Sequence, residues 1–290
     1  MTIHVEGWSI SGQSFVFQPT LGLYPDNTPY VKGFPEPGST IDAVFVRQAN
    51  LQDFYAAMWY VSELASRFSG SIVLHVPFFP CARQDRSNPT GDVLDSKYRV
   101  MRDISRMIME GDIHSLWTFD IHSEAYNDML GDRLINVPAA GIIVSAIENG
   151  IQINPTGAYY DTVIAPDKGA RLRAEQVGAV FHTPVVVAEK TRDVSTGYIT
   201  GFEIDTSQSA MQKVLVIDDI CDGGMTFKIL AESLPSETEK HLFVTHGLFS
   251  NHSAVTLRNH YDHIVSTNSA LGYREGVQTI NLFPGVFNDA

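Results

Sequence analysis

The chain has 290 residues, of which 44% are hydrophobic and 18% are charged, and this is the composition of an ordinary globular protein. That composition excludes a disordered or collagen-like chain, and two cysteines are too few for a disulfide framework. Twenty Lys and Arg residues against 33 Asp and Glu residues give a formal net charge of −13. This is the wrong sign for a surface that binds nucleic acid or an anionic bilayer. Any phosphate must therefore be bound locally, by backbone amides, a metal ion and a few placed cations.

Residues 1–15 lack the basic-then-apolar layout of a secretion signal, and no apolar run approaches the ~18 residues of a membrane-spanning helix. The two cysteines, Cys81 and Cys221, stand in unlike surroundings. We therefore expect a reduced, soluble, cytoplasmic protein with no nucleic-acid or membrane partner.

Short apolar runs alternate with helical patterns along the whole chain, which is typical of a parallel sheet covered by helices. In the first half the spacing of apolar residues predicts a helix over 51–68 behind an Asn50 cap, a strand over 71–76, a polar loop over 81–95, a helix over 97–110 and a strand over 115–122. We therefore expect an α/β fold.

The second half repeats this alternation. It predicts helices over 139–149, 169–181, 225–233 and 252–258, and strands over 162–165, 184–189, 198–204, 213–218, 241–245 and 263–266. At about 100–200 residues per domain, we expect two domains, 1–139 and 140–290, with a boundary near Pro138.

The clearest candidate site is the segment 214–226, VLVIDDICDGGMT. A buried strand ends in the paired acids Asp218 and Asp219, and a glycine turn at Gly223 and Gly224 leads into a helix. Ligands of open α/β sheets bind beyond the carboxyl ends of strands, and a glycine turn at a helix N-terminus offers free N–H groups to a phosphate. Two carboxylates would repel that phosphate, so they suit neutral hydroxyls, such as a ribose diol, or a metal ion. The alternative is a glycine turn with solvated acids.

This segment resembles the phosphoribosyl-pyrophosphate-binding motif of type I phosphoribosyltransferases and of ribose-phosphate diphosphokinases. Further segments favour the diphosphokinases. CARQDR at 81–86 is similar to their ATP-binding loop, and FDIHS at 119–123 is similar to their Asp-x-His strand end. On this resemblance, His122 is a magnesium ligand.

Two more segments occur in the order that the family has them. IAPDKGA at 164–170 resembles the family's Pro-Asp-x-Gly loop, in which the aspartate, here Asp167, lies at the metal. AEKTRD at 188–193 resembles its catalytic Lys-x-Arg. Lys190 and Arg192 lie two residues apart, so on an extended segment both cations point the same way.

Near the N-terminus, YPDNTPYV at 24–31 resembles a family segment that contacts adenine across a subunit interface. Asn27 and Thr28 replace the family's Gly and Glu. Stretches at 245–250 and 266–269 also match, and the chain looks closest to the shorter, archaeal-like members.

The resemblance implies two tandem phosphoribosyltransferase-like domains, the first binding ATP and the second ribose 5-phosphate. It implies a magnesium-dependent transferase of nucleotide biosynthesis that moves the β,γ-diphosphoryl group of ATP to the anomeric hydroxyl and releases AMP. A site completed by a neighbour implies a homo-oligomer. The implied residues are Arg83, Gln84, Asp85, Tyr24 and Asp26 for ATP, His122 and Asp167 for Mg²⁺, Lys190 and Arg192 for catalysis, and Asp218, Asp219, Asp222, Gly223, Gly224 and Thr226 for the ribose phosphate.

One departure leaves the acceptor open. The family loop usually reads Asp-Thr-x-x-Thr, whereas residues 222–226 read DGGMT and keep only the second hydroxyl. A larger 5-substituted ribose such as ADP-ribose is therefore an alternative acceptor. A phosphoribosyltransferase would share only the 214–226 loop, and a catalytically silent regulatory homologue would have no need of both the metal site and the cation pair.

Cys221 lies beside the acids, so we expect a raised thiol pKa and assign it no chemistry.

Overall fold

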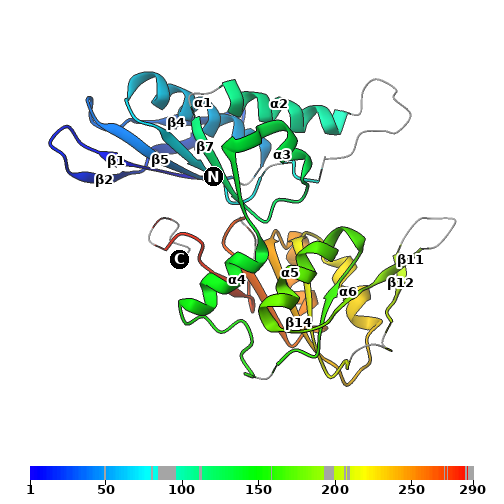
Figure 1. The fold of residues 1–290 in the computed structure, drawn as a ribbon. Coiled ribbons are helices and arrows are strands. Elements are labelled where there is room, and N and C mark those ends of the chain that lie inside the picture. The colour runs from blue at the N-terminus through cyan, green and yellow to red at the C-terminus, as the bar shows by residue number, and fades with distance from the viewer. Residues whose placement is uncertain are drawn as a thin grey trace. The chain divides into compact units, whose positions relative to one another are not determined.

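The computed structural model describes residues 1–48, 50–79, 81–83, 96–110, 113–157, 159–192, 199–205, 207, 210–270, 272, 274–284 and 286 (Figure 1). The chain forms two compact units. Unit 1 contains Met1–Val137 together with the segment that starts at Phe283, and unit 2 contains Pro138–Leu282. Among the described residues, no helix is both long and apolar enough to cross a bilayer.

Unit 1 is built on a six-stranded sheet with the order β2-β1-β5-β6-β7-β8. Its strands are β1 (Thr2–Trp8), β2 (Ser14–Phe17), β5 (Thr40–Arg47), β6 (Ile72–His75), β7 (Ile113–Phe119) and β8 (Leu134–Val137), with a separate hairpin of β3 (Thr20–Leu23) and β4 (Pro29–Lys32). Strands β5 to β8 are parallel, whereas β1 runs antiparallel to β2 and β5. The structure thus adds five strands before residue 50 to those expected from apolar runs.

The helices of unit 1 are α1 (Leu51–Arg67), α2 (Ser96–Glu110) and α3 (Ala125–Leu130), followed by the short turn η1 (Gly131–Arg133). Helix α1 begins where expected, because the Asn50 side chain accepts a hydrogen bond from the N–H of Asp53 at 2.9 Å. Its apolar stripe, which includes Phe54, Val61 and Leu64, is fully buried in the core. Burial of each such side chain stabilises the fold by about 1.5–3 kcal/mol.

An aromatic cluster lies on the sheet of unit 1. The ring of His75 stacks on Phe45 with centroids 4.4 Å apart. Phe283, which follows the last strand of unit 2 in sequence, packs edge-on against Phe45, His75 and Phe119 at 5.1–5.4 Å. Burial lowers the pKa of His75 to about 4, so this imidazole is neutral in the folded protein at pH 7.

Unit 2 contains a fully parallel six-stranded sheet with the order β10-β9-β13-β14-β15-β16. The strands are β9 (Thr162–Ala165), β10 (Val185–Val187), β13 (Lys213–Cys221), β14 (Glu239–Gly247), β15 (His263–Thr267) and β16 (Gln278–Ile280), and a separate hairpin joins β11 (Glu189–Arg192) to β12 (Ile199–Glu203). The near-continuous burial of β13 and β14 explains their apolar sequences.

The helices of unit 2 are α4 (Ala139–Glu148), α5 (Arg171–Phe181), α6 (Met225–Glu232) and α7 (Ser253–Leu257), with short 3₁₀ turns η2 (Lys168–Ala170) and η4 (Ser250–His252). Phe227 of α6 and Leu257 of α7 share one buried core with Val214 and Val216 of β13 and Leu242 of β14. The expected α/β fold, with mostly parallel sheets flanked by helices, is therefore confirmed.

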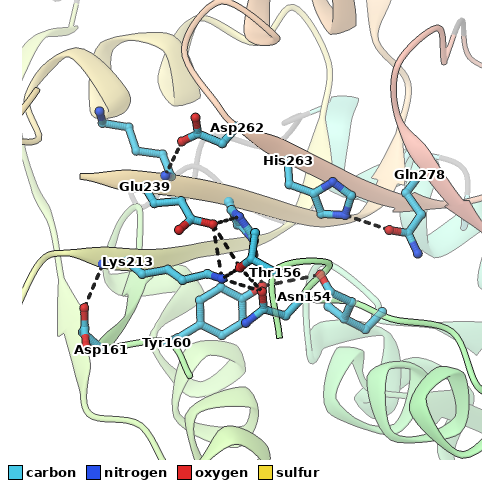
Figure 2. A network of polar contacts seen from close by, with 12 residues as sticks. Asn154, Thr156, Tyr160, Asp161, Lys213, Glu239, Asp262, His263 and Gln278 are labelled. Atoms are coloured by element: carbon cyan, nitrogen blue, oxygen red, sulfur yellow. Dashed lines mark hydrogen bonds and ion pairs between the residues drawn. The ribbon is translucent and has the colours of Figure 1, made fainter. Parts of the chain in front are cut away.

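A buried polar network lies where β13 and β14 begin (Figure 2). The ammonium of Lys213 contacts Glu239 Oε1 at 3.2 Å and donates to Asn154 Oδ1 at 2.6 Å. His241 bridges Glu239 and Tyr160, with Nε2 and Nδ1 at 2.9 and 3.0 Å from their oxygens. Burial, with the nearby Lys213, lowers the pKa of His241 to about 4. The network satisfies a buried cation at the edge of the sheet opposite to its carboxyl ends.

Candidate functional site

The carboxyl ends of three neighbouring strands, β10, β9 and β13, bring together the polar residues of unit 2. Lys190 follows β10 by three residues, Asp167 follows β9 by two, and Asp218 and Asp219 lie near the end of β13. Parallel strands all end at one edge of a sheet, so side chains that are distant in sequence meet there.

The acid pair is held by an arginine from α5. Arg173 Nη1 lies 3.3 Å from Asp218 Oδ1, and Nη2 lies 3.8 Å from Asp219 Oδ2. The Asp219 residue is 3% exposed, and the side chains of Arg173 and Asp218 are 12% and 19% exposed. Burial and the neighbouring Asp219 carboxylate raise the pKa of Asp218, and the guanidinium of Arg173 opposes this. The arginine therefore favours the ionised form of the pair, which is the form that accepts hydroxyl hydrogen bonds.

A second ion pair joins the two neighbouring strand ends. Lys190 Nζ lies 2.5 Å from Asp167 Oδ2, and Asp167 Oδ1 accepts from the N–H groups of Gly169 and Ala170 at 2.9 and 3.2 Å. Burial by itself would raise the pKa of Asp167, but the Lys190 ammonium and these N–H groups outweigh it, so the pKa of Asp167 is lowered. The same carboxylate thus caps η2 and places the Lys190 ammonium at the sheet edge.

The glycine turn after β13 is fixed by its neighbours. Gly224 has φ +74°, and a Cβ there would lie 3.1 Å from the Cβ of Ser253, so the position requires glycine. Gly223 is different, because a Cβ there would meet nothing within 4 Å. The hydroxyl of Ser253 donates to the carbonyl of Asp222 at 2.7 Å. Thr226 then lies in the first turn of α6 and is half-buried.

Cys221 lies at the end of the same strand and is fully buried. Burial, together with the nearby Asp218 and Asp222 carboxylates, raises the pKa of the thiol to about 12. The expected raised pKa is confirmed, and the thiol remains protonated at pH 7.

Lys190 and Arg192 both belong to β11. The pairing of β11 with β12 shifts register between Thr191 and Arg192. The Arg192 side chain lies outside the described part of the structure, so the expectation that both cations point the same way stays a prediction.

The candidate residues of unit 1 lie on its loops. Tyr24 is 49% exposed, with its ring centroid 4.9 Å from that of Tyr30, and Asp26 accepts from the N–H of Thr28 at 2.9 Å. Arg83 and His122 are both exposed, His122 three residues beyond β7. The other two residues expected in the ATP loop, Gln84 and Asp85, lie outside the described residues.

Magnesium needs few protein ligands, because it keeps several waters and binds substrate phosphates. Among the described residues, no group of three or more His, Cys, Asp or Glu side chains could hold a metal ion. The Asp167 carboxylate of unit 2, with its side chain 41% exposed, and the exposed His122 imidazole of unit 1 could each donate one ligand, and the expectation that they hold one ion stays a prediction.

Sequence reasoning missed Arg173. The segment similar to the family's Pro-Asp-x-Gly loop ends at Ala170, and the helix expected over 169–181 carries arginines at both 171 and 173. Arg171 pairs with Glu175 one helical turn away and its side chain is 66% exposed. The packing of α5 against β9 and β13 identifies Arg173 as the residue that meets the acids.

No protein-family model matches the chain. A ribose-phosphate pyrophosphokinase of Cereibacter sphaeroides is 27% identical over 178 residues, covering 60% of this chain and 50% of that protein. A ribose-phosphate pyrophosphokinase of Thermococcus kodakarensis is 26% identical over 256 residues, covering 85% of this chain and 83% of that protein. The match thus spans about half the length of the Cereibacter protein.

The fold has a counterpart among solved structures. The crystal structure of a phosphoribosylpyrophosphate synthetase from Mycobacterium smegmatis superposes with a TM-score of 0.71 over 91% of this chain and 86% of that chain, at 18% identity. This match supports the expected fold of two phosphoribosyltransferase-like domains. Together with the sequence relatives, it confirms the family resemblance that the motifs indicate.

Proposed function

We propose that this chain, a homologue of the ribose-phosphate pyrophosphokinases, transfers the β,γ-diphosphoryl group of ATP to the anomeric hydroxyl of ribose 5-phosphate. The products are phosphoribosyl pyrophosphate, a precursor for nucleotide biosynthesis, and AMP. The proposal rests mainly on two ion pairs that lie at one edge of the same sheet. Arg173 pairs with the acids Asp218 and Asp219, and Lys190 pairs with Asp167.

The acid pair serves the sugar in this proposal. Asp218 and Asp219 accept hydrogen bonds from the ribose hydroxyls, which are neutral and so are not repelled by the carboxylates. The turn from Asp222 to Thr226 surrounds the 5-phosphate with backbone N–H groups and one hydroxyl. The open space around Gly223 is consistent with close approach of a phosphate to the backbone.

The cations serve the reacting phosphates. Diphosphoryl transfer depends on in-line placement and on neutralising charge at the phosphorus. Lys190 and Arg192 supply positive charge to the transferred group. His122 and Asp167 would hold magnesium, which would supply further positive charge to the ATP phosphates.

ATP binding is assigned to domain 1–139 and ribose-phosphate binding to domain 140–290. Arg83, Gln84 and Asp85 orient ATP, and Tyr24 and Asp26 of a neighbouring subunit contact adenine, so the active form is a homo-oligomer. The partners are small molecules, and the chain works in the cytoplasm without nucleic acid or membrane.

The test is a product analysis with the purified chain, ATP and Mg²⁺. Ribose 5-phosphate and ADP-ribose are offered in separate reactions, and AMP release is followed by chromatography with mass identification of the second product. We expect AMP and a diphosphorylated pentose with ribose 5-phosphate, and much slower turnover with ADP-ribose. Faster turnover with ADP-ribose would contradict the proposed acceptor, and no AMP with either acceptor would contradict the activity.

A further inference from the structure

The described residues of unit 2 line an open, polar hollow of about 560 Å³, within the size range of small-molecule sites. It lies where β14 and β15 begin and where the chain turns after α7. The lining residues that bear on its chemistry are Lys240, Arg258, Asn259, His260, Asp262 and His263.

This hollow is separate from the acid pair. Lys240 is opposite Val214 in the register of β13 and β14. Asp218 lies four residues further along β13, about 13 Å at ~3.3 Å per residue. The hollow therefore opens at the amino ends of the strands, opposite to the edge that carries the proposed active site.

The hollow carries cations with spare hydrogen-bonding capacity. The Lys240 ammonium donates to the carbonyl of Thr238 at 3.2 Å, which uses one of its three N–H groups. The Arg258 guanidinium lies 4.0 Å from Glu275, beyond hydrogen-bond distance, and its side chain is 47% exposed. No guanidinium N–H of Arg258 donates to a side chain or carbonyl in the part of the chain that the structure describes, whereas its backbone N–H donates to the carbonyl of Ala254 at 3.1 Å.

The one lining carboxylate is already engaged. Asp262 Oδ2 accepts from the backbone N–H of Lys240 at 2.7 Å (Figure 2). His263 Nε2 donates to the amide oxygen of Gln278 at 2.7 Å, which leaves its Nδ1 for another partner. The lining residues thus include two permanent cations and one carboxylate, while Glu275 and Glu232 lie 4.0 and 3.9 Å from Arg258 and His260.

One close backbone contact and one buried hydroxyl characterise the lining. Gly276 has φ +71°, and a Cβ there would lie 2.5 Å from Cδ and Nε of Arg258, so this backbone lies flat against the arginine stem and restricts it. Thr238, which also lines the hollow, is 4% exposed, and its hydroxyl has no hydrogen-bond partner among the described residues. A buried hydroxyl without a partner is unusual in a folded protein.

We propose that this hollow binds the phosphate group of a small phosphate monoester. Arginine recognises phosphate oxygens through paired N–H groups, and lysine adds a point charge. The amide of Asn259 and the imidazole of His260 provide further hydrogen-bonding groups, and the volume leaves room for the organic part of the ligand.

Calorimetric titration of the full chain with inorganic phosphate, uridine 5′-monophosphate and sulfate tests this. We expect saturable binding of the monophosphate, tighter than that of inorganic phosphate, and at least tenfold weaker binding in Arg258→Gln. Gly276→Ala, which crowds Arg258, should weaken binding threefold or more. Gly150→Ala is the matched control, because Gly150 has φ +77° but nothing within 4 Å of a Cβ, and it should bind as wild type does.

The location is tested by reacting histidines with diethyl pyrocarbonate and measuring modification by mass spectrometry. The monophosphate should slow modification of His260 and His263 at least threefold in wild type and leave it unchanged in Arg258→Gln. Equal binding of sulfate, affinity unchanged in Arg258→Gln, or no protection of these histidines would overturn the proposal. If inorganic phosphate binds as tightly as the monophosphate, the organic part of the ligand contributes nothing, which would contradict a site for phosphate monoesters.

Discussion

Replacing Arg173 by alanine removes the cation that the structure places between Asp218 and Asp219. At an effective dielectric constant of about 20, unit charges at these separations attract by about 4–5 kcal/mol per pair before desolvation is counted. Breaking a buried pair typically costs about 3–5 kcal/mol. The Asp218 side chain is 19% exposed and regains some hydration, so we expect unit 2 to lose about 3 kcal/mol of stability at pH 8.

This loss should depend on pH with a definite sign. Without the arginine, the pKa of Asp218, already raised by burial and by Asp219, rises further in the folded variant. Between that raised pKa and about 3.9, the unfolded value, the folded variant binds a proton that its unfolded chain does not. The variant therefore gains stability relative to wild type as the pH falls from 8 toward 5.

The two units can be followed separately. The three tryptophans, Trp8, Trp59 and Trp117, all lie in unit 1, so tryptophan fluorescence reports unfolding of that unit. Hydrogen exchange of β13 peptides, measured by mass spectrometry, reports opening of unit 2. We expect the protection of β13 to fall about 10²-fold in Arg173→Ala, since 1.4 kcal/mol corresponds to a tenfold change, with the fluorescence transition unchanged.

Arg171→Ala is the matched control. This arginine lies two residues away on the same helix, but its side chain is 66% exposed, and such surface pairs contribute about 0–1 kcal/mol. A stability loss below about 0.5 kcal/mol for Arg173→Ala, the size of an ordinary surface change, or a loss that does not vary with pH, would contradict the role of Arg173 in holding the acid pair.

The remaining predictions concern catalysis, the glycine turn and acid stability. Lys190→Ala should lower turnover in the AMP-release assay by at least ~10²-fold, because it removes a transition-state contact. A change below threefold would exclude that role. The control is Lys168→Ala: the Lys168 side chain is 84% exposed, and turnover of this variant should stay within twofold of wild type. Gly223→Thr should leave the melting temperature unchanged and lower KM for ribose 5-phosphate, because threonine adds a hydroxyl donor. Gly224→Ala should cost about 1–2 kcal/mol of stability because Gly224 has a left-handed backbone conformation. Equal melting temperatures of the two variants would contradict this difference. As the pH falls from 6.5 to 4, the free energy of unfolding of unit 2 should decrease by up to about 3 kcal/mol in urea titrations of wild type followed by circular dichroism. The reason is that His241 takes up a proton in the unfolded chain, whereas in the folded form its pKa is about 4 and it does not. His241→Gln should reduce this loss of stability at low pH, and a pH profile equal to that of wild type would contradict the assignment of the effect to His241.

The regular elements could be predicted because apolar periodicity and caps act locally. The Asn50 cap and the apolar stripe of α1 are examples. Strand ends were less predictable, since they depend on pairing. β13 continues beyond its acids to Cys221 because Ile220 and Cys221 still pair with β14, while β7 ends at Phe119, before Asp120, whose φ of +42° breaks the extended conformation.

The candidate site was predictable where one segment carries its chemistry. The acid pair and the glycine turn lie within 13 residues of sequence, so their proximity follows from the chain. The Lys190–Asp167 ion pair and the role of Arg173 depend on the strand order β10-β9-β13. That order is a property of the packed sheet, and no local pattern specifies it.

In the proposed reaction, a diphosphoryl group moves in one piece from ATP to the anomeric position of ribose 5-phosphate. Phosphorus NMR of the reaction with Mg²⁺ tests it most directly, because a diphosphate on the anomeric carbon gives two mutually coupled signals distinct from those of ATP. The proposed function predicts those two signals growing in step with the single signal of AMP. Formation of ADP with a singly phosphorylated sugar, or no change in the ATP signals, would contradict it.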